Sequence, residues 1–514
     1  MPFETELKVM PAIAFDTEKI RRQFDAQFPE RASGTARIEI VKRSIDARKK
    51  PILYVLRIRA WAAGESTDMA PKHFEITKPS LRKRVAIVGF GPAGIFAAFQ
   101  LLEKGLLPIV IERGKQVRDR RRDLAALNKS LVVNPESNYC FGEGGAGTYS
   151  DGKLYTRSKK RGDVEKVLQT FVQYGADPDI LVNAHPHIGT NKLPGIIENM
   201  REAILAAGGE IHFDTKLTDF IVKNQRITEI ICNGEKNLPV DALILATGHS
   251  ARDIFHLLNN KGIAIEAKPF AMGVRIEHSQ ALIDRMQYKQ AQRDENLPPA
   301  AYSIVTQAEG CGVFSFCMCP GGIIAPAATD AGETVVNGWS PSKRNGIFAN
   351  SGFVVTVDPP RWQQQFGSNP LSALAFQQYF EKKAFDSTGS IIAPAQRVED
   401  FIQRKVSSTL PECSYLPGIA SADMYGVLPP FISSAMRSAL IHFGKNMPGY
   451  RSNEALLVGI ESRTSSPVRI PRDKETLLHP DINNLYPCGE GAGYAGGIVS
   501  AALDGMACAN AVNI

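Results

Sequence analysis

The stretch Arg84-Val-Ala-Ile-Val-Gly-Phe-Gly-Pro-Ala-Gly94 decides the fold of this chain. An apolar run with the composition of a buried strand leads directly into glycines at positions 89, 91 and 94. Apolar residues then recur at helical spacing from Ala93 to Lys104, and a second apolar run extends from Leu107 to Glu112. A strand, a glycine-rich turn, a helix and a second strand in this order predict a βαβ unit that binds a dinucleotide.

Each glycine of this segment has its own physical task. Gly89 makes the tight turn, Gly91 lets the backbone approach a pyrophosphate, and Gly94 lets the helix pack closely on the strand. The free N–H groups and the positive end of the helix would face the pyrophosphate. Glu112, 23 positions after Gly89, would accept hydrogen bonds from the ribose hydroxyls and would repel a 2′-phosphate. The alternative is a glycine turn that holds no nucleotide.

Two later segments add to this pattern. Ala246-Thr247-Gly248 follows the apolar run ALIL, about 160 residues after the first glycine segment. The third segment, Leu485-Tyr-Pro-Cys-Gly-Glu-Gly-Ala-Gly-Tyr-Ala-Gly-Gly-Ile498, ends where a helix-like sequence begins. Its closely spaced glycines would present backbone N–H groups to an anion at a helix N-terminus.

In this order, the three segments resemble the FAD-binding framework of the glutathione-reductase/p-hydroxybenzoate-hydroxylase group of flavoproteins. The phrases FGEGGAGTYSDGKL, HPHIGTNKL, CMCPGG and ESRTSSPVRI are similar to a family of bacterial FAD-dependent dehydrogenases with an additional N-terminal domain, over essentially the whole chain. The resemblance implies FAD as the cofactor. One departure is Glu490, which stands where the usual acid is Asp. The residues expected to bind FAD are Gly89, Gly91, Pro92, Ala93, Gly94, Glu112, Arg113, Gly145, Gly147, Thr247, Gly248, Gly489, Glu490, Gly496, Gly497 and Ile498.

A second match to G-x-G-x-x-G, at Gly142–Gly147, has no buried strand before it and no acid-ended strand at the usual distance after it. We therefore predict no NAD site there. One interpretation is a loop over the flavin, with the N–H groups of Gly145 and Gly147 near the ring. The other is a loop with a purely structural role.

The expected fold is α/β, with a Rossmann-like FAD-binding domain, an inserted mixed α+β substrate domain and a small N-terminal α+β domain. Residues 1–80 would form the N-terminal domain, with a helix at 17–28 and strands at 36–47 and 51–61. Residues 81–260 and 455–514 would form the FAD-binding domain, and residues 261–454 the substrate domain between them.

Four residues are candidates for catalysis. Cys317 and Cys319 either act as redox or substrate-contacting thiols, or they are inert cysteines buried on one strand, where positions i and i+2 share a face. His187 either supplies an acid or base or only packs a loop. Arg463 either neutralises an anionic substrate or the reduced flavin, or forms a structural ion pair. No other ligands stand at a spacing that would complete a zinc site, so no metal is expected.

Composition narrows the classes of partner. The net charge of +7 suits an anionic ligand such as a dinucleotide but is too small to indicate nucleic acid. The seven Lys and Arg residues between positions 31 and 50 are interpreted as a solvated face. We find no secretory signal, no run of about 18 apolar residues and no disulfide framework. These features predict a cytoplasmic protein without a membrane partner.

The expected reaction is hydride transfer between an unidentified small-molecule substrate and flavin N5. No separate pyridine-nucleotide domain is visible, so either NAD(P)H binds transiently at the flavin face as electron donor, or the substrate itself is the donor. Two alternatives are a flavin-dependent modifier of a macromolecule such as tRNA, and a flavoprotein whose FAD serves structure or partner docking. The substrate and the oligomeric state do not follow from the sequence.

Overall fold

A five-stranded parallel sheet lies at the centre of the part of the chain that carries the glycine segments. The computed structural model describes residues 2–65, 72, 74–80, 83–156 and 162–514. The strand order is β22-β10-β4-β5-β6, and all four pairings are parallel. These strands are β4 (Arg84–Val88), β5 (Leu107–Ile111), β6 (Glu210–His212), β10 (Ala242–Leu245) and β22 (Leu485–Pro487). Apart from the half-buried edge strand β6, with the sequence Glu-Ile-His, these strands are mostly apolar because both faces of a parallel sheet are buried.

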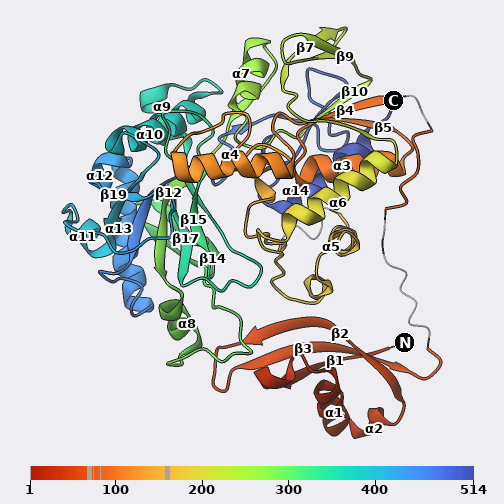
Figure 1. Cartoon of the computed structure of the whole chain (residues 1–514), viewed down its shortest axis with the longest axis vertical. Helices are drawn as coiled ribbons and strands as arrows, with labels where there is room; N and C mark the ends of the chain where they lie inside the picture. The colour runs from red at the N-terminus through yellow and green to blue at the C-terminus, as the bar shows by residue number, and fades with distance from the viewer. Residues whose placement is uncertain (1, 66–71, 73, 81–82, 157–161) are drawn as a thin grey trace.

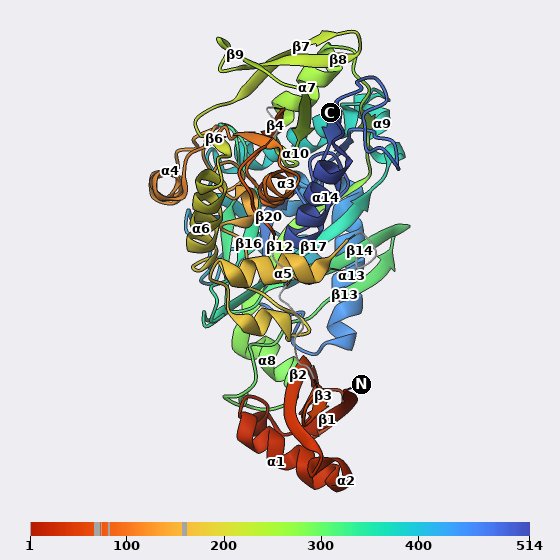
Figure 2. The ribbon, with the colours of Figure 1, turned by 90° about the vertical axis from the view of Figure 1, so that its right-hand side faces the viewer.

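Two helices begin at glycine segments and pack against each other (Figure 2). These are α3 (Pro92–Glu103) and α14 (Ile498–Ala511). A β-carbon on Gly505 would lie 2.0 Å from the carbonyl oxygen of Ala93, so this helix crossing requires a residue without a side chain. The other helices of this half are α4 (Val117–Ser130), α5 (Val164–Gln173), α6 (Leu193–Ala206) and α7 (Arg252–Asn260). None of the described helices combines the length and apolar character needed to cross a lipid bilayer.

An antiparallel meander precedes β10. It comprises β7 (Leu217–Lys223), β8 (Arg226–Cys232) and β9 (Lys236–Pro239), in that spatial order. The meander is anchored to the third glycine segment by Asn484, whose side-chain amide donates to the carbonyl oxygen of Ile227 at 2.8 Å and whose side-chain oxygen accepts from the Ile227 N–H at 2.8 Å.

A second, seven-stranded sheet follows in the order β13-β14-β17-β12-β20-β18-β19, on the left of Figure 1. Its strands are β12 (Phe270–Ser279), β13 (Ile304–Ala308), β14 (Cys311–Cys319), β17 (Phe348–Val357), β18 (Ala393–Arg397), β19 (Ile419–Ser421) and β20 (Leu456–Glu461). Strand β20 pairs with both β12 and β18, so this sheet extends past the boundary predicted at residue 454. The boundary was placed too early because β20 is an apolar run much like those of the parallel sheet.

Smaller elements surround this sheet. Strands β15 (Ile323–Pro326) and β16 (Val336–Trp339) form a hairpin, and β11 (Glu266–Ala267) pairs with β21 (Val468–Arg469). The helices are α8 (Gln280–Tyr288), α9 (Pro359–Phe366), α10 (Ser372–Thr388), α11 (Val398–Gln403), α12 (Met424–Val427) and α13 (Pro430–Asn446).

The N-terminal unit projects from one end of the body in both views (Figures 1 and 2), and its buried apolar residues continue the core of the second half of the chain. It contains β1 (Phe3–Val9), α1 (Thr17–Gln27), α2 (Pro29–Ala32), β2 (Thr35–Asp46) and β3 (Leu53–Ala62), with the sheet order β1-β3-β2. Arg43 joins it to the body, because its N–H donates to the carbonyl oxygen of Val182 at 2.7 Å and its carbonyl oxygen accepts from Ala184 at 2.9 Å. One arginine of the basic stretch is therefore buried at this contact rather than solvated.

Candidate functional site

The three glycine segments touch one another at the carboxyl ends of β4, β10 and β22. A β-carbon on Gly89 would lie 2.4 Å from the carbonyl oxygen of Ala246, and one on Gly491 would lie 2.4 Å from that of Gly248. The obstructing atoms are backbone atoms, which cannot rotate away as a side chain could. These glycines therefore bring three stretches distant in sequence into one site, where ligands bind in open α/β sheets.

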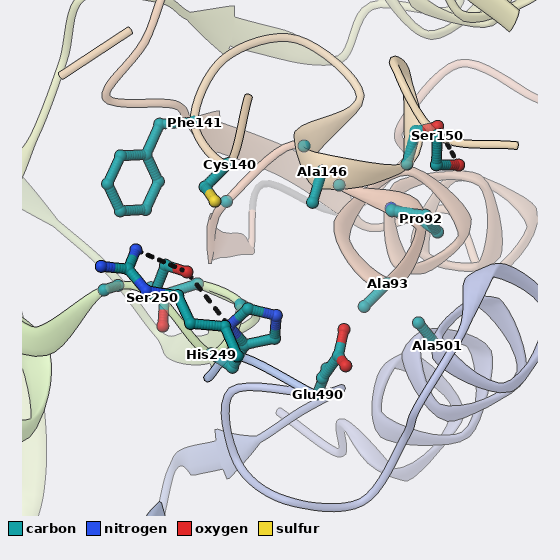
Figure 3. A pocket seen from close by; sticks show the side chains of 18 of the residues that line it. Pro92, Ala93, Cys140, Phe141, Ala146, Ser150, His249, Ser250, Glu490 and Ala501 are labelled. Atoms are coloured by element: carbon teal, nitrogen blue, oxygen red, sulfur yellow. Dashed lines mark hydrogen bonds between the residues drawn. The ribbon is translucent and has the colours of Figure 1, made fainter. Parts of the chain in front are cut away.

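A cavity of about 330 Å³ lies at this junction (Figure 3). Most of the residues predicted to bind FAD line it: Gly89, Gly91, Pro92, Ala93, Glu112, Arg113, Gly145, Gly147, Thr247, Gly248, Glu490, Gly496, Gly497 and Ile498. Gly94 and Gly489 are not part of the wall. Gly94 packs α3 onto the preceding turn, and the N–H of Gly489 donates to Asp504 at 2.7 Å.

The loop that contains Gly145 and Gly147 forms one wall of the cavity, next to the first glycine segment. A β-carbon on Gly145 would lie 3.0 Å from the α-carbon of Gly91. The fully buried Arg120 holds this loop by donating to the carbonyl oxygens of Asn138 (2.8 Å), Glu143 (2.8 Å) and Gly145 (2.9 Å). Sequence reasoning missed Arg120, because nothing in a basic helical stretch distinguishes one buried arginine from its exposed neighbours.

Glu112 has a structural role that was not predicted from the sequence. Its carboxylate accepts hydrogen bonds from the N–H groups of Phe90, Gly114 and Gly142, each at 2.9 Å. An ionised carboxylate has about four acceptor positions, so one remains for a ribose hydroxyl. The neighbouring Arg113 side chain also lines the cavity.

At the opposite side of the cavity, burial raises the pKa of Glu490 from 4.5 to about 7, although Lys268 opposes the shift. Among the described residues, no group donates a hydrogen bond to this carboxylate, so little offsets the effect of burial on its pKa. Figure 3 shows its side chain beside Ala93 and Ala501, at the starts of α3 and α14.

We predict that the FAD-free protein loses stability as the pH rises from about 4.5 to about 7. A carboxyl with a raised folded-state pKa contributes its full stability below its unfolded-state pKa, and this contribution disappears as the pH passes the folded-state pKa. Urea denaturation at a series of pH values checks this, with Glu490→Gln as the comparison. The difference in unfolding free energy between the two proteins should grow in the variant's favour across this range. A pH-independent difference would contradict the prediction.

The predicted thiols do not share one face. The register of β14 shifts between Phe316 and Cys319, and Cys317 has a φ of +52°. This bulge breaks the two-residue alternation on which one of the two alternatives rested, that of two inert thiols buried on a common face, and that alternative is wrong. Cys317 is exposed to the cavity, whereas Cys319 is buried although it also reaches the wall. Burial within the molecule raises the pKa of Cys317 to about 11, so its thiol is protonated at neutral pH.

A buried arginine and carboxylate stand beside these cysteines, and sequence reasoning missed both. Arg275 donates to Glu461 at 3.1 Å, to Asn350 at 3.0 Å and to the sulfur of Cys319 at 3.6 Å. Glu461 lines the cavity, as does Lys153. The available signal was Arg275 itself, a charge directly after the apolar run Phe270–Val274 of β12, which has to find a partner when buried.

Arg463 forms a buried cluster of ion pairs, in agreement with the structural alternative proposed from the sequence. It also reaches the cavity wall. Its guanidinium donates to Glu333 at 2.9 Å and to Glu381 at 2.9 and 3.1 Å, and Arg252 pairs with the same two carboxylates. Arg463 also donates to the hydroxyl of Ser250 at 3.4 Å.

His249 continues this chain into the cavity (Figure 3). Because arginine can only donate, the Ser250 oxygen accepts from Arg463, and it lies 3.0 Å from His249 Nδ1, within hydrogen-bond distance. Burial and the nearby Arg463 lower the pKa of His249 to about 4, so the ring is neutral at neutral pH.

His187 is not brought to the cavity. Its Nε2 lies 3.0 Å from the carbonyl oxygen of Ser342, and its backbone pairs with that of Lys153. Of the two alternatives for His187, this placement supports the one in which it only packs a loop. Lys153, whose backbone pairs with that of His187, does line the cavity. Nothing in the sequence indicates which of these two residues reaches the cavity.

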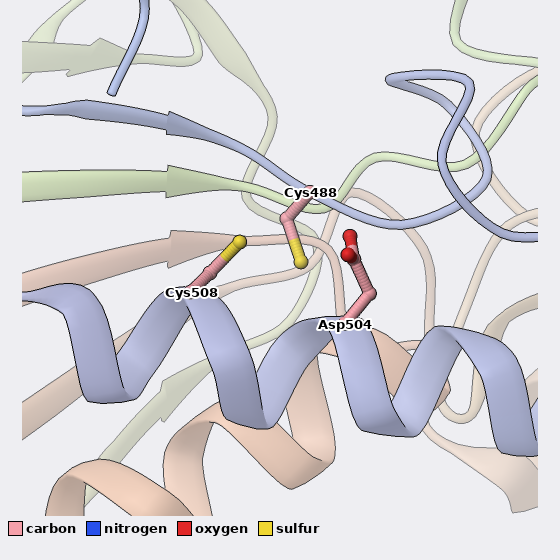
Figure 4. A group of neighbouring side chains, drawn as sticks. All are labelled: Cys488, Asp504 and Cys508. Carbon is pink, nitrogen blue, oxygen red and sulfur yellow. The ribbon is translucent and has the colours of Figure 1, made fainter. Parts of the chain in front are cut away.

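Cys488, Asp504 and Cys508 lie together behind the third glycine segment (Figure 4). Arg472 donates to Asp504 at 2.6 Å and to the sulfur of Cys508 at 3.2 Å. The guanidinium already neutralises this carboxylate, so a metal cation here would meet a positive charge.

The residues of the cavity fit FAD. The N-cap residue of helix α3 is Gly91, and no side chain caps the first N–H groups of the helix, which leaves them to an anion. Space beside the ends of the other two segments is open, since a β-carbon on Gly248, Gly496 or Gly497 would meet no atom within 4 Å.

Comparison with known proteins agrees with this cofactor. Residues 269–464 match the family described as "FAD-dependent protein, C-terminal domain-like", and residues 1–61 match a domain of unknown function. A thiamine thiazole synthase of Aeropyrum pernix is 25% identical over 34% of this chain and 57% of its own length. The crystal structure of CtdE in complex with FAD is similar at 10% identity and a TM-score of 0.32, over 83% of this chain and 82% of that chain. A score this low assigns no residue role.

A relative of nearly full length defines the family. An uncharacterized protein of Clostridium beijerinckii is 41% identical over 491 residues, which cover 92% of this chain and 91% of that protein. The chain therefore belongs to the same protein family as the Clostridium beijerinckii protein, and its cofactor is FAD.

Proposed function

We propose that this protein is an FAD-dependent oxidoreductase of the glutathione-reductase-like group, and that it transfers a hydride between a small-molecule substrate and the flavin. The observation that carries the proposal is the composition of one cavity wall. It combines all three glycine segments with a thiol, an amine and a carboxylate, namely Cys317, Lys153 and Glu461. Convergent polar groups of this kind in a dinucleotide cavity are typical of an active site.

The chemistry that FAD supplies when bound is hydride exchange at N5 of its ring. The chain would bind the pyrophosphate at the start of α3 and orient the ring with the start of α14. Cys317, held at the bulge with its thiol protonated, would exchange the proton that accompanies the hydride. Arg275 would fix Glu461 in place, and Lys153 would provide a positive charge for an anionic group of the substrate.

Cys317→Ser is expected to slow flavin reduction about a hundredfold without loss of FAD, because a serine hydroxyl is a much weaker acid than a thiol. The measurement is anaerobic stopped-flow bleaching of the flavin by a donor found in a metabolite screen. Cys311→Ser is the matched control, since Cys311 lies on the same strand, is buried and does not line the cavity. Equal rates in both variants would remove Cys317 from the mechanism, and no reduction by any donor would contradict the proposed function.

A further inference from the structure

A second cavity, of about 830 Å³, lies beside the FAD cavity and shares no lining residue with it. Pockets for small ligands have volumes of about 300–1,000 Å³. Its wall is formed by Arg121, Leu124, Ala125, Asn128, Lys129, Tyr139, Tyr149, Thr190, Asn191, Pro194, Trp339 and Leu416. These residues come from α4, seen across the front of Figure 1, from the following loop, from the start of α6 and its approach, and from two places in the second half of the chain.

The two cavities are separated by a single layer of chain. Tyr139 and Tyr149 line the second cavity, while their neighbours Cys140 and Ser150 line the FAD cavity. In the same way, Trp339 lines the second cavity and Gly338 the first. Arg120 fixes the partition through its bonds to three carbonyl oxygens of this loop. The second cavity is therefore a distinct space with a firmly held wall.

Three aromatic rings give this cavity surfaces for stacking. The rings of Tyr139 and Tyr149 meet edge to face, with centroids 6.2 Å apart, so the two planes are not stacked on each other. Trp339, at the end of β16, adds the third ring. Rings of this kind stack on planar ligands with little loss of side-chain entropy, because each has only two rotatable side-chain bonds.

The charges of the cavity have one sign. Arg121 and Lys129 lie two turns apart on α4, and the lining contains no aspartate or glutamate. Neither cation forms an ion pair within the described residues, although other arginines and lysines of the same helix region do. Hydrogen-bonding groups are supplied by Asn128, Thr190 and Asn191. An anion would thus find two unneutralised cations at this wall.

We propose that the second cavity binds a planar aromatic ligand that carries an anionic group, of about the size of a mononucleotide. The tyrosines and Trp339 would stack on the ring, and Arg121 and Lys129 would bind the phosphate or carboxylate. Free mononucleotides, the nucleotide half of a dinucleotide and aromatic carboxylates share this chemistry. The site is separate from the FAD cavity and does not depend on the proposed reaction.

The test is calorimetric titration of the FAD-saturated protein with AMP, 2-naphthoate, adenosine and inorganic phosphate. AMP or 2-naphthoate should bind at least about tenfold more tightly than adenosine and phosphate, because only the first two offer both a ring and a charge. Tighter binding of AMP would identify a nucleotide as the source of the chemistry, and tighter binding of 2-naphthoate an aromatic acid. Binding of all four with equal affinity, or of none, would overturn the proposal.

Substitutions in the lining test whether the ligand binds in the second cavity. Arg121→Gln/Lys129→Gln should weaken the anionic ligand about tenfold or more and leave adenosine unchanged, whereas Trp339→Ala should weaken AMP and adenosine alike. Arg118→Gln is the matched control, because Arg118 is an exposed cation on α4 outside the cavity, and it should bind as the wild type does. The flavin absorbance reports that FAD is retained in each protein. Wild-type affinity in the double variant would overturn the assignment.

Discussion

Gly94→Ala is expected to abolish FAD binding and to lower the free energy of unfolding by about 3 kcal/mol or more. A β-carbon at this position would lie 1.9 Å from the carbonyl oxygen of Gly89 and 3.3 Å from the Ile87 side chain. The first contact is with backbone, so α3 has to move away from β4, and its free N–H groups leave the pyrophosphate position. Loss of the ligand removes a further stabilisation, which is about 2.7 kcal/mol when FAD is present at a hundred times its dissociation constant.

Gly195→Ala is the control for this substitution. Gly195 is also in the first turn of a helix, α6, but a β-carbon there would meet no atom within 4 Å. Alanine should keep FAD and raise stability by about 0.5–1 kcal/mol, since glycine weakens a helix relative to alanine. The ratio of flavin to protein absorbance and the denaturation midpoint measure both effects. A yellow Gly94→Ala protein with wild-type stability would show that the predicted close packing is absent.

The parts of the fold that follow from local pattern were predictable from the sequence. The βαβ unit, the meander and the N-terminal helix and strands depend on apolar periodicity and turn residues that lie close together in the chain. The strand β1 was missed, because FETELKV reads as a charged segment when its partner β3 is not known. Likewise β20 could be assigned to its sheet only through its pairing with β12, about 180 residues away.

The glycine segments were predictable in the site because their task is fixed by backbone geometry. The residues proposed for catalysis were less predictable. Cys317 reaches the cavity through a bulge that no propensity indicates. Arg275 and Glu461 join it through pairing across the sheet, and Lys153 joins it from a loop outside that sheet. Residues brought together only by tertiary structure carry no signal in a single sequence, apart from a charge inside an apolar strand.

Arg463→Met is expected to lower the free energy of unfolding by about 3–5 kcal/mol, the cost of leaving a buried carboxylate without its partner. Within the described part of the chain, the variant would leave Arg252 as the only guanidinium paired with Glu333 and Glu381, both of which are buried. Burial and the neighbouring Glu381 already raise the pKa of Glu333. Without Arg463 that pKa rises further, so the loss of stability should be smallest at acid pH, where Glu333 is protonated, and should grow as the pH rises.

Two comparison variants separate this role from a role in catalysis. Arg451→Met removes a partly exposed ion pair, in which the side chain of Arg451 lies 2.7 Å from Glu399, and it should cost no more than about 1 kcal/mol. In Arg463→Met/Glu333→Gln the unpaired charge is gone, so much of the lost stability should return. Urea denaturation at several pH values measures these differences, and flavin reduction by the same donor is followed in parallel. If Arg463→Met costs no more than Arg451→Met but slows reduction, Arg463 acts on the substrate or the flavin and the cluster is incidental.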